Sequence, residues 1–581
     1  MKQGLPYAAM VASLAFACSG EVSDVVPDFE VDAPEIAVDD DGMPVDQPDQ
    51  EPVVEDFEPD DSIWPTETLA VSTLTSECSI EDNAMPDIRR LSNTSYGRAV
   101  ERVTGYTIPR TQLIEALPAQ LRDKTINNVD FGLRVNRVYT QRVVDLAGSV
   151  VEAMEWEPFF AEKGEGCSSG GACRSTYIRN TFESAIGRPP NDEEFDIYQT
   201  LFTDARDIGA NFQEAARVVL HSILASAQFL FVVADGSQDV TAERSRRISL
   251  LLYDEPNHPA VLEAAARGDL DTREKVETFV KAQLREAKAS VGLEEFYYDW
   301  MNLDRLDYTI DLSAAGYADY SLATNEAMRT NLRDYLNTVV LEEGMPFILA
   351  FRDQRMFVSE ETAWIFGDDM SMSGAMDGEG AVISTEGIDK RVGLLTTPTM
   401  ATLTLKIESK SIVDRGVFVN EHILCRDIPL PSAVTPIDDT AFPEDASQRE
   451  KLEGHQQGAC ASCHVQLDAP GYALEPFGPV GEVKTEDKFG NPLADDGTFE
   501  IDGVQQNFDN VYEFSDMLAG SDELVSCIVE RRLSHALARF VHGDDQLHAC
   551  ELERLEEIFR ASNFDLRELT VGIATSSYFM N

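Results

Sequence analysis

No Lys or Arg occurs between Lys2 and Arg89, and Asp, Glu, Pro and Val dominate the stretch from Glu21 to Asp61. Like charges repel one another and prolines interrupt helices, so a stretch of this composition cannot bury enough apolar surface to fold. We therefore expect residues 19–75 to be an extended acidic tether that separates the first residues from the folded part of the chain.

The first 18 residues have the layout of a bacterial export signal. Lys2 precedes an apolar stretch from Leu5 to Ala17 that is too short to span a bilayer. The stretch ends in "LAFAC", which resembles a lipobox, so Cys18 is the candidate site of acylation. Ordinary signal-peptide cleavage is the alternative. Ser19, in place of Asp, favours an outer-membrane lipoprotein that is periplasmic or surface-exposed.

The charge balance argues against nucleic acid as a partner. The chain has 47 Lys and Arg against 104 Asp and Glu, a formal charge of −57. Such a field repels nucleic acid and anionic lipid headgroups, whereas a basic docking partner or divalent cations are easier to accommodate. The alternative is that the acidity only makes the surface well solvated.

The length of 581 residues exceeds what one core usually supports, so we expect several domains. Apolar residues recur at helical spacing in three stretches, the first after a capping-box-like start at Asp271 and Glu274. The text "GNPLADDGTFEIDG", from Gly490 to Gly503, predicts a short hairpin. The chain is therefore expected to be mainly α, a multidomain helical assembly with one small β-hairpin. The stripes are Val276, Phe279, Val280 and Leu284; Met328, Leu332, Tyr335, Leu336 and Val339; and Val525, Ile528, Val529, Leu533, Leu537 and Phe540.

Eight cysteines remain besides Cys18, an even number that suits an oxidising compartment. Two of them, Cys460 and Cys463, belong to a Cys-x-x-Cys-His motif, which leaves six for three disulfides. Cys167 and Cys173 flank a glycine-rich loop and are expected to form a local bridge. Cys527 with Cys550 is the next pairing, and Cys78 with Cys425 follows by elimination.

The strongest chemical signal is "CASCH", from Cys460 to His464. Covalent attachment of a c-type haem needs two thiols that form thioethers with the vinyl groups and an adjacent histidine that binds the iron. Cys460 and Cys463 are therefore the predicted attachment residues, and His464 is the predicted proximal ligand. A redox disulfide, half of a zinc site and a plain Cys460–Cys463 bridge are the alternatives.

The sixth iron ligand is less well defined. Met517 is the first candidate, an open position is another, and further candidate side chains are His535, His542, Met370, Met372 and Met376. A second candidate metal site is a turn that contains Asp495, Asp496, Glu500 and Asp502. Calcium could bind there, although the spacing is not that of an EF-hand and a solvated acidic turn is favoured.

Two segments resemble a known family. "RGVFVNEHILCRDIPLP" (Arg415 to Pro431) and "CASCHVQLDAPGYALEPFGPVG" (Cys460 to Gly481) resemble the cytochrome-like domain-of-unknown-function family 1588. Family members often have Met where this chain has Leu467, Asp where it has Gly478, and Trp near Val483. These departures leave the attachment motif intact.

Other segments resemble the domains found with 1588 in multidomain proteins of planctomycetes and myxobacteria. "LSNTSYGRAVERVTG" resembles family 1587, "FESAIGRPPNDEEFDIY" with "ILASAQFLF" resembles 1595, "FYYDWMNLDRL" lies in a 1592-like stretch, and Cys527 to Phe579 is similar to 1585. The resemblance implies a domain order after the signal (1–18) and the tether (19–75): 76–165, 166–240, 241–380, the haem-attachment module at 381–503, and 504–581.

The resemblance implies an exported haem protein and no substrate. We expect one covalent haem c, one-electron transfer, and a redox partner that carries basic groups. A haem-dependent oxidoreductase with an open iron position is the enzyme alternative. A haem-free surface scaffold stabilised by disulfides is the third.

Overall fold

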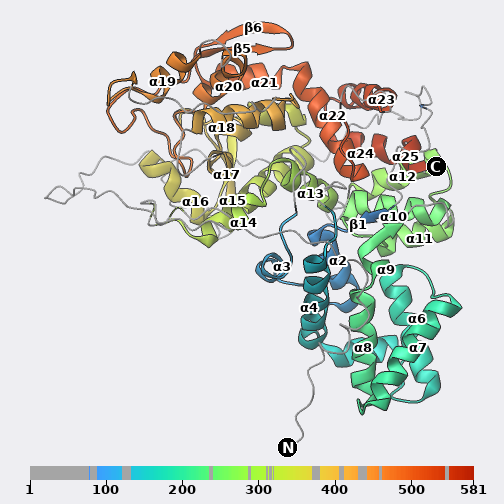
Figure 1. Ribbon diagram of the computed structural model, residues 1–581. Coiled ribbons are helices and arrows are strands. Elements are labelled where there is room, and N and C mark those ends of the chain that lie inside the picture. The colour runs from blue at the N-terminus through green and yellow to red at the C-terminus, as the bar shows by residue number, and fades with distance from the viewer. Residues whose placement is uncertain are drawn as a thin grey trace, which may run out of the picture.

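The computed structural model consists of helices and three two-stranded sheets arranged in two lobes (Figure 1). The prediction of a mainly α protein is confirmed. The smaller lobe contains residues 88–233, and the larger lobe contains the rest of the described chain. The structure describes residues 78, 88–120, 133–233, 240–285, 290–308, 312, 317, 319–369, 380–404, 411–428, 441–456, 461–542 and 548–580.

The smaller lobe is a helical bundle closed by a short sheet in which β1 pairs antiparallel with β2. Capping boxes start α7 and α8, where Asn191 and Asn211 accept from the backbone of Glu194 and Glu214. Its core is separate from that of the larger lobe. The elements are β1 (Ile88–Arg90), α2 (Asn93–Thr104), α3 (Arg110–Ala116), α4 (Arg137–Ala153), α5 (Trp156–Lys163), α6 (Gly171–Ile186), α7 (Asp192–Asp207), α8 (Phe212–Leu224), α9 (Ala227–Leu230) and β2 (Phe231–Val233).

The first part of the larger lobe is also helical. Its α12 begins one residue later than the sequence predicts, because Thr272, and not Asp271, caps the helix by accepting from the Lys275 backbone. The elements are α10 (Val240–Tyr253), α11 (Pro259–Arg267), α12 (Arg273–Gln283), α13 (Val291–Trp300), α14 (Arg305–Tyr308), α15 (Leu322–Tyr335), η5 (Leu336–Glu342), η6 (Phe347–Phe351), β3 (Arg355–Val358), α16 (Glu360–Ala363), η7 (Trp364–Asp369) and β4 (Ala381–Ser384).

The second part of the larger lobe contains the predicted hairpin. Asp502 and Gly503 form its turn with φ of 52° and 71°, the conformation that a two-residue hairpin loop favours. The second strand continues beyond Gly503. The elements are η8 (Leu394–Thr396), α17 (Pro398–Leu403), α18 (Ser411–Phe418), η9 (Val419–Ile423), α19 (Gln448–His455), α20 (Ala461–Ala473), β5 (Gly497–Ile501), β6 (Val504–Phe508), α21 (Val511–Ala519), α22 (Asp522–Leu537), α23 (Ala549–Ala561), α24 (Leu566–Ala574) and α25 (Ser577–Met580).

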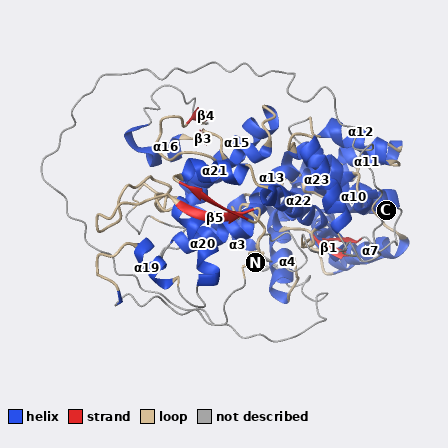
Figure 2. Cartoon of the chain, turned by 90° about the horizontal axis from the view of Figure 1, so that it is seen from above, coloured by secondary structure: helices blue, strands red, loops and turns tan. Residues whose placement is uncertain are grey.

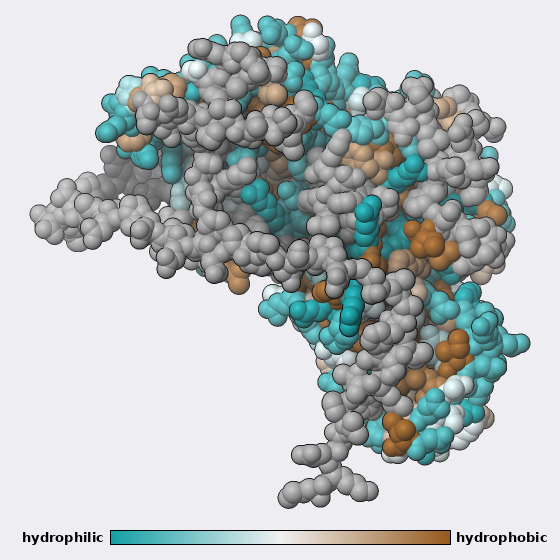
Figure 3. Space-filling view, viewed as in Figure 1, coloured by the Kyte–Doolittle hydropathy of each residue, from teal (hydrophilic) through white to brown (hydrophobic). Residues whose placement is uncertain are grey.

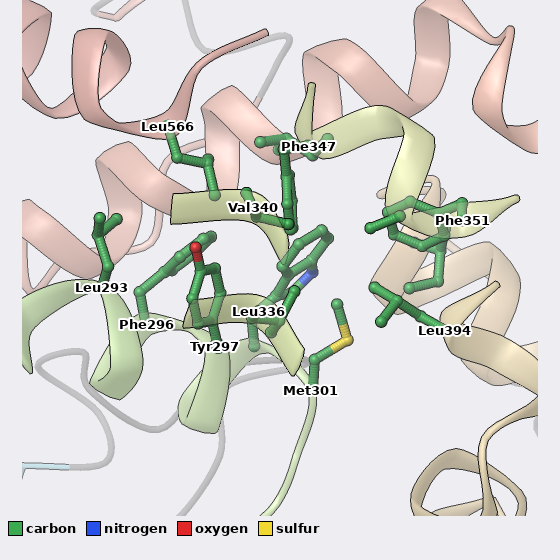
Figure 4. Packing of buried hydrophobic residues seen from close by; sticks show 14 of the residues in the cluster. Leu293, Phe296, Tyr297, Met301, Leu336, Val340, Phe347, Phe351, Leu394 and Leu566 are labelled. Atoms are coloured by element: carbon green, nitrogen blue, oxygen red, sulfur yellow. The ribbon is translucent and has the colours of Figure 1, made fainter. Parts of the chain in front are cut away.

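One apolar core joins both parts of the larger lobe. Side chains from α13, η5, η6, η8 and α24 converge in it, among them Phe296, Val340, Phe347, Leu394 and Leu566 (Figure 4). The C-terminal helices α24 and α25 lie beside α10, and α24 also lies beside α12, although these helices are far apart in the sequence (Figure 2). The three predicted stripes contribute to this core, except that α22 ends at Leu537 and Phe540 lies beyond it.

Three disulfides stabilise the described chain. Cys167 pairs with Cys173, as predicted. The other two predicted pairings are wrong, because Cys425 pairs with Cys527 and Cys78 pairs with Cys550. The fold explains the difference: η9 packs against α22 and brings Cys425 to Cys527, while the Ser577 hydroxyl holds the carbonyl of Cys78 against the C-terminal helices.

Where described residues are visible in Figure 3, hydrophilic ones predominate and hydrophobic ones form small separate groups. Among the described residues, none of the helices combines the length and the apolar character that a membrane span requires. The export signal with Cys18, the tether at 19–75, and Met370, Met372 and Met376 lie outside the described residues.

Candidate functional site

The predicted attachment motif lies at the start of α20. Cys463 and His464 are in the first turn of this helix and are half-buried, whereas Cys460 lies outside the described residues. Cys463 has a free thiol, in contrast to the six other described cysteines, which form disulfides. The motif therefore presents an unused thiol beside an imidazole.

Two glycines let α18 cross α20 at very short range. A Cβ atom on Gly416 of α18 would lie 1.7 Å from the carbonyl oxygen of Leu467, and one on Gly471 of α20 would lie 2.1 Å from that of Ile412. No side chain fits in either place. The backbone of the motif helix is thus pressed directly against α18.

Polar side chains of the α18–η9 segment fix the same crossing. Arg415 is 1% exposed and donates to the carbonyl oxygens of Leu474 and, at 2.6 Å, Phe477. Burial lowers the pKa of Arg415 to about 10, so its guanidinium stays charged at neutral pH. Asn420 donates to the carbonyl oxygen of Gln466 at 3.0 Å. The middle of α20 and the residues just after it are therefore tied to the preceding segment.

The imidazole of His464 is held from one side by a buried carboxylate. His464 Nδ1 donates to Asp468 Oδ1 at 3.0 Å, one helical turn along α20. Asp468 is 1% exposed, and its Oδ2 accepts from Nε2 of Gln456 at 2.7 Å. A proton fixed on Nδ1 leaves the lone pair of the neutral ring on Nε2, which is the nitrogen that a metal would use.

A small apolar cluster supports this region. Ile412, Leu452 and Tyr472, from α18, α19 and α20, form it with Val413 packed against it. The guanidinium of Arg449 lies 4.2 Å from the centre of the Tyr472 ring. The cluster is separate from the main core, to which α20 also contributes Ala469 and Ala473.

The donor set fits a covalently attached haem. Cys463 would supply one thioether, and His464 would supply an iron ligand whose second nitrogen is already hydrogen-bonded, as metal-bound histidines usually are. Val465, the next residue, is 50% exposed, so the helix surface at this position is accessible. Within the described residues, no group of three or more His, Cys, Asp and Glu side chains is arranged to hold a metal ion.

The candidate distal ligands lie on other elements. Met517 is on α21 and packs against the main core, and its role as a ligand stays a prediction. His535 is buried on α22 with its ring edge against Phe296. His542 lies 3.6 Å from Asp427.

The acidic turn is part of the scaffold around the hairpin. Asp495 is buried and pairs with Lys390 at 2.7 Å, and Asp496 pairs with Arg449 at 2.9 Å. Asp502 accepts from the backbone nitrogens of Asp522 and Glu523 at the start of α22. These carboxylates thus serve as ion-pair and capping partners of neighbouring elements.

Sequence reasoning missed the residues that support the motif, namely Gly416, Gln456 and Asp468. Asp468 carried a usable signal, because a carboxylate four residues after a helical histidine lies on the same helix face. Gln456 had no such signal, since only the packing of α19 on α20 brings it to Asp468.

The fold and the site define a helical protein in which α20, the helix of the Cys-x-x-Cys-His motif, packs closely against α18. Gly416 of α18 and Gly471 of α20 allow this close packing. Three family models match it: Protein of unknown function (DUF1592) over residues 241–367, Protein of unknown function (DUF1588) over 391–487 and Protein of unknown function (DUF1585) over 505–579. These matches confirm the resemblance of the chain to families 1592, 1588 and 1585. No curated protein and no solved structure matches the chain significantly. The 1587-like and 1595-like assignments of residues 76–165 and 166–240 stay predictions.

Proposed function

We propose that this chain is an exported c-type haem protein of the cell envelope that transfers single electrons. The observation that carries the proposal is the free thiol of Cys463 beside His464, whose Nδ1 is fixed by Asp468. When bound, a haem at this motif supplies a one-electron iron couple.

Each residue of the motif has a separate task in this proposal. Cys460 and Cys463 tether the porphyrin, and His464 donates a lone pair to the iron. Gly416, Gly471 and Arg415 hold α20 in place and would thereby hold the orientation of His464. A site that moves little between oxidation states suits an electron carrier.

The sequence outside the described residues supplies the proposed location. The signal that ends at Cys18 would attach the protein to the outer membrane, and the acidic tether would hold the lobes away from it. The formal charge of −57 would attract a basic redox partner and would raise the rate of encounter at low salt.

The test is covalent haem attachment in a host that matures c-type cytochromes. We expect a pyridine haemochrome spectrum and a haem-stained band on a denaturing gel, both lost in Cys463→Ala. The matched control is Cys167→Ser/Cys173→Ser, which removes two cysteines that are paired away from the motif and should keep the haem. A colourless wild-type chain, beside a control cytochrome that matures normally, would overturn the proposal.

A further inference from the structure

Asp468 is a buried carboxylate whose ion-pair partner among the described residues is His464. Its side chain is 1% exposed, and among the described residues its ion pair within 4 Å is with His464, not with a Lys or Arg. Burying a carboxylate costs several kcal/mol unless a close partner compensates for the lost hydration. Gln456 supplies a neutral hydrogen bond and no charge. The charge of Asp468 is therefore compensated mainly by its interaction with His464.

The direction of the hydrogen bond matters for the imidazole. The carboxylate accepts from Nδ1 and draws that proton toward itself, which increases the electron density on Nε2. A more basic Nε2 binds ferric iron more strongly than ferrous iron. The negative charge of Asp468, little screened in its buried position, acts in the same direction.

We propose that Asp468 is a positioning residue that increases the electron donation of His464 and thereby lowers the reduction potential of the iron bound there. This inference rests on the proposed haem attachment. It assigns the site to a low-potential carrier, which passes electrons to partners of higher potential, and it gives a function to the buried carboxylate of Asp468.

An ordinary helix pair is the competing explanation. Ion pairs four residues apart stabilise helices by about 0.2–0.5 kcal/mol, and such a role would leave the potential of the iron unchanged. The two explanations therefore predict different effects of Asp468 on the reduction potential of the iron, whereas both allow an effect on stability.

The experiment compares midpoint potentials of the full-length haem protein and two variants. Asp468→Asn keeps an oxygen that accepts from Nδ1 but removes the charge. We expect its equilibrium constant for reduction to rise at least tenfold, which is about 59 mV for one electron. The control is Glu453→Gln on α19, which removes a 59% exposed carboxylate paired with Arg449, and should leave the potential unchanged. Equal potentials in wild type and Asp468→Asn, or equal shifts in both variants, would overturn the inference.

A second measurement covers the case in which Asp468→Asn does not mature. In the haem-free Cys463→Ala chain labelled with ¹⁵N-histidine, the His464 ring should carry its proton on Nδ1, with assignment from His464→Gln. A proton on Nε2 would overturn the inference. A wild-type chain without haem would instead refute the proposed function, so the two failures are distinguishable.

Discussion

Gly416 lies so close to the backbone of Leu467 that an added Cβ atom would be 1.7 Å from the Leu467 carbonyl oxygen. Leu467 is three residues after His464, so this contact sets the depth at which the motif helix lies on α18. The obstacle is backbone, which cannot rotate away as a side chain can. Substitution must therefore separate the helices.

Gly416→Ala is expected to lower the free energy of unfolding by about 3 kcal/mol, at the upper end of the usual cost of overpacking. Covalent haem should also decrease, because His464 would be displaced. Denaturant unfolding and haem staining measure the two effects. Gly171→Ala is the control, since a Cβ there meets nothing within 4 Å. Equal stability of the two variants would show that the crossing is not tight.

Local features of the fold could be predicted from the sequence, because local patterns determine them. The stripe from Met328 to Val339 is buried, and the Asp502-Gly503 turn closes the hairpin. The Cys167–Cys173 bridge belongs to the same class, since its partners are six residues apart.

Long-range relationships could not be predicted in this way. Cys78 and Cys550 are 472 residues apart, and only the packing of the C-terminal helices brings them together. In the candidate site, the motif itself was predicted, whereas the support from Gly416 and Gln456 depends on how three helices pack.

The Cys78–Cys550 bridge should contribute more to stability than the local one. A disulfide restricts the unfolded chain more when it closes a longer loop, so Cys78→Ser/Cys550→Ser should cost a few kcal/mol more than Cys167→Ser/Cys173→Ser. Thermal unfolding compares the two. Peptide mapping without reduction should recover the two half-cystines in one linked fragment, and a Cys527–Cys550 fragment would contradict the pairing.

Glu475, just after α20, should make stability depend on pH. Burial raises its pKa from 4.5 to about 7, against the opposing effect of Arg449 and Arg415. The folded state therefore binds this proton more tightly than the unfolded state does. The resulting stability is fully present below about pH 4.5 and is lost as the pH rises to about 7.

Glu475→Gln should remove this dependence, and at pH 8 it should be more stable than the wild type by about 1–3 kcal/mol. Denaturant unfolding at pH 5 and pH 8 measures the change. Glu453→Gln, at an exposed carboxylate, should keep the wild-type pH dependence. If Glu475→Gln is less stable than the wild type at pH 8, the carboxylate is needed in its charged form.

A substitution of Gln456 should shift the midpoint potential in the direction opposite to that of Asp468→Asn. Its amide donates to Asp468 Oδ2 at 2.7 Å and withdraws negative charge from the carboxylate. In Gln456→Leu the charge should concentrate on Oδ1, which accepts from His464 Nδ1, so the imidazole should donate more strongly. We expect a midpoint potential below that of the wild type, with a smaller shift than in Asp468→Asn, because one neutral hydrogen bond is lost and the charge remains. Gln448→Leu removes the same side chain from the start of α19 and should have no effect on the potential. A midpoint potential above that of the wild type in Gln456→Leu would mean that Asp468 had moved away from His464. The sign of the shift therefore shows whether the carboxylate acts on the iron through the histidine.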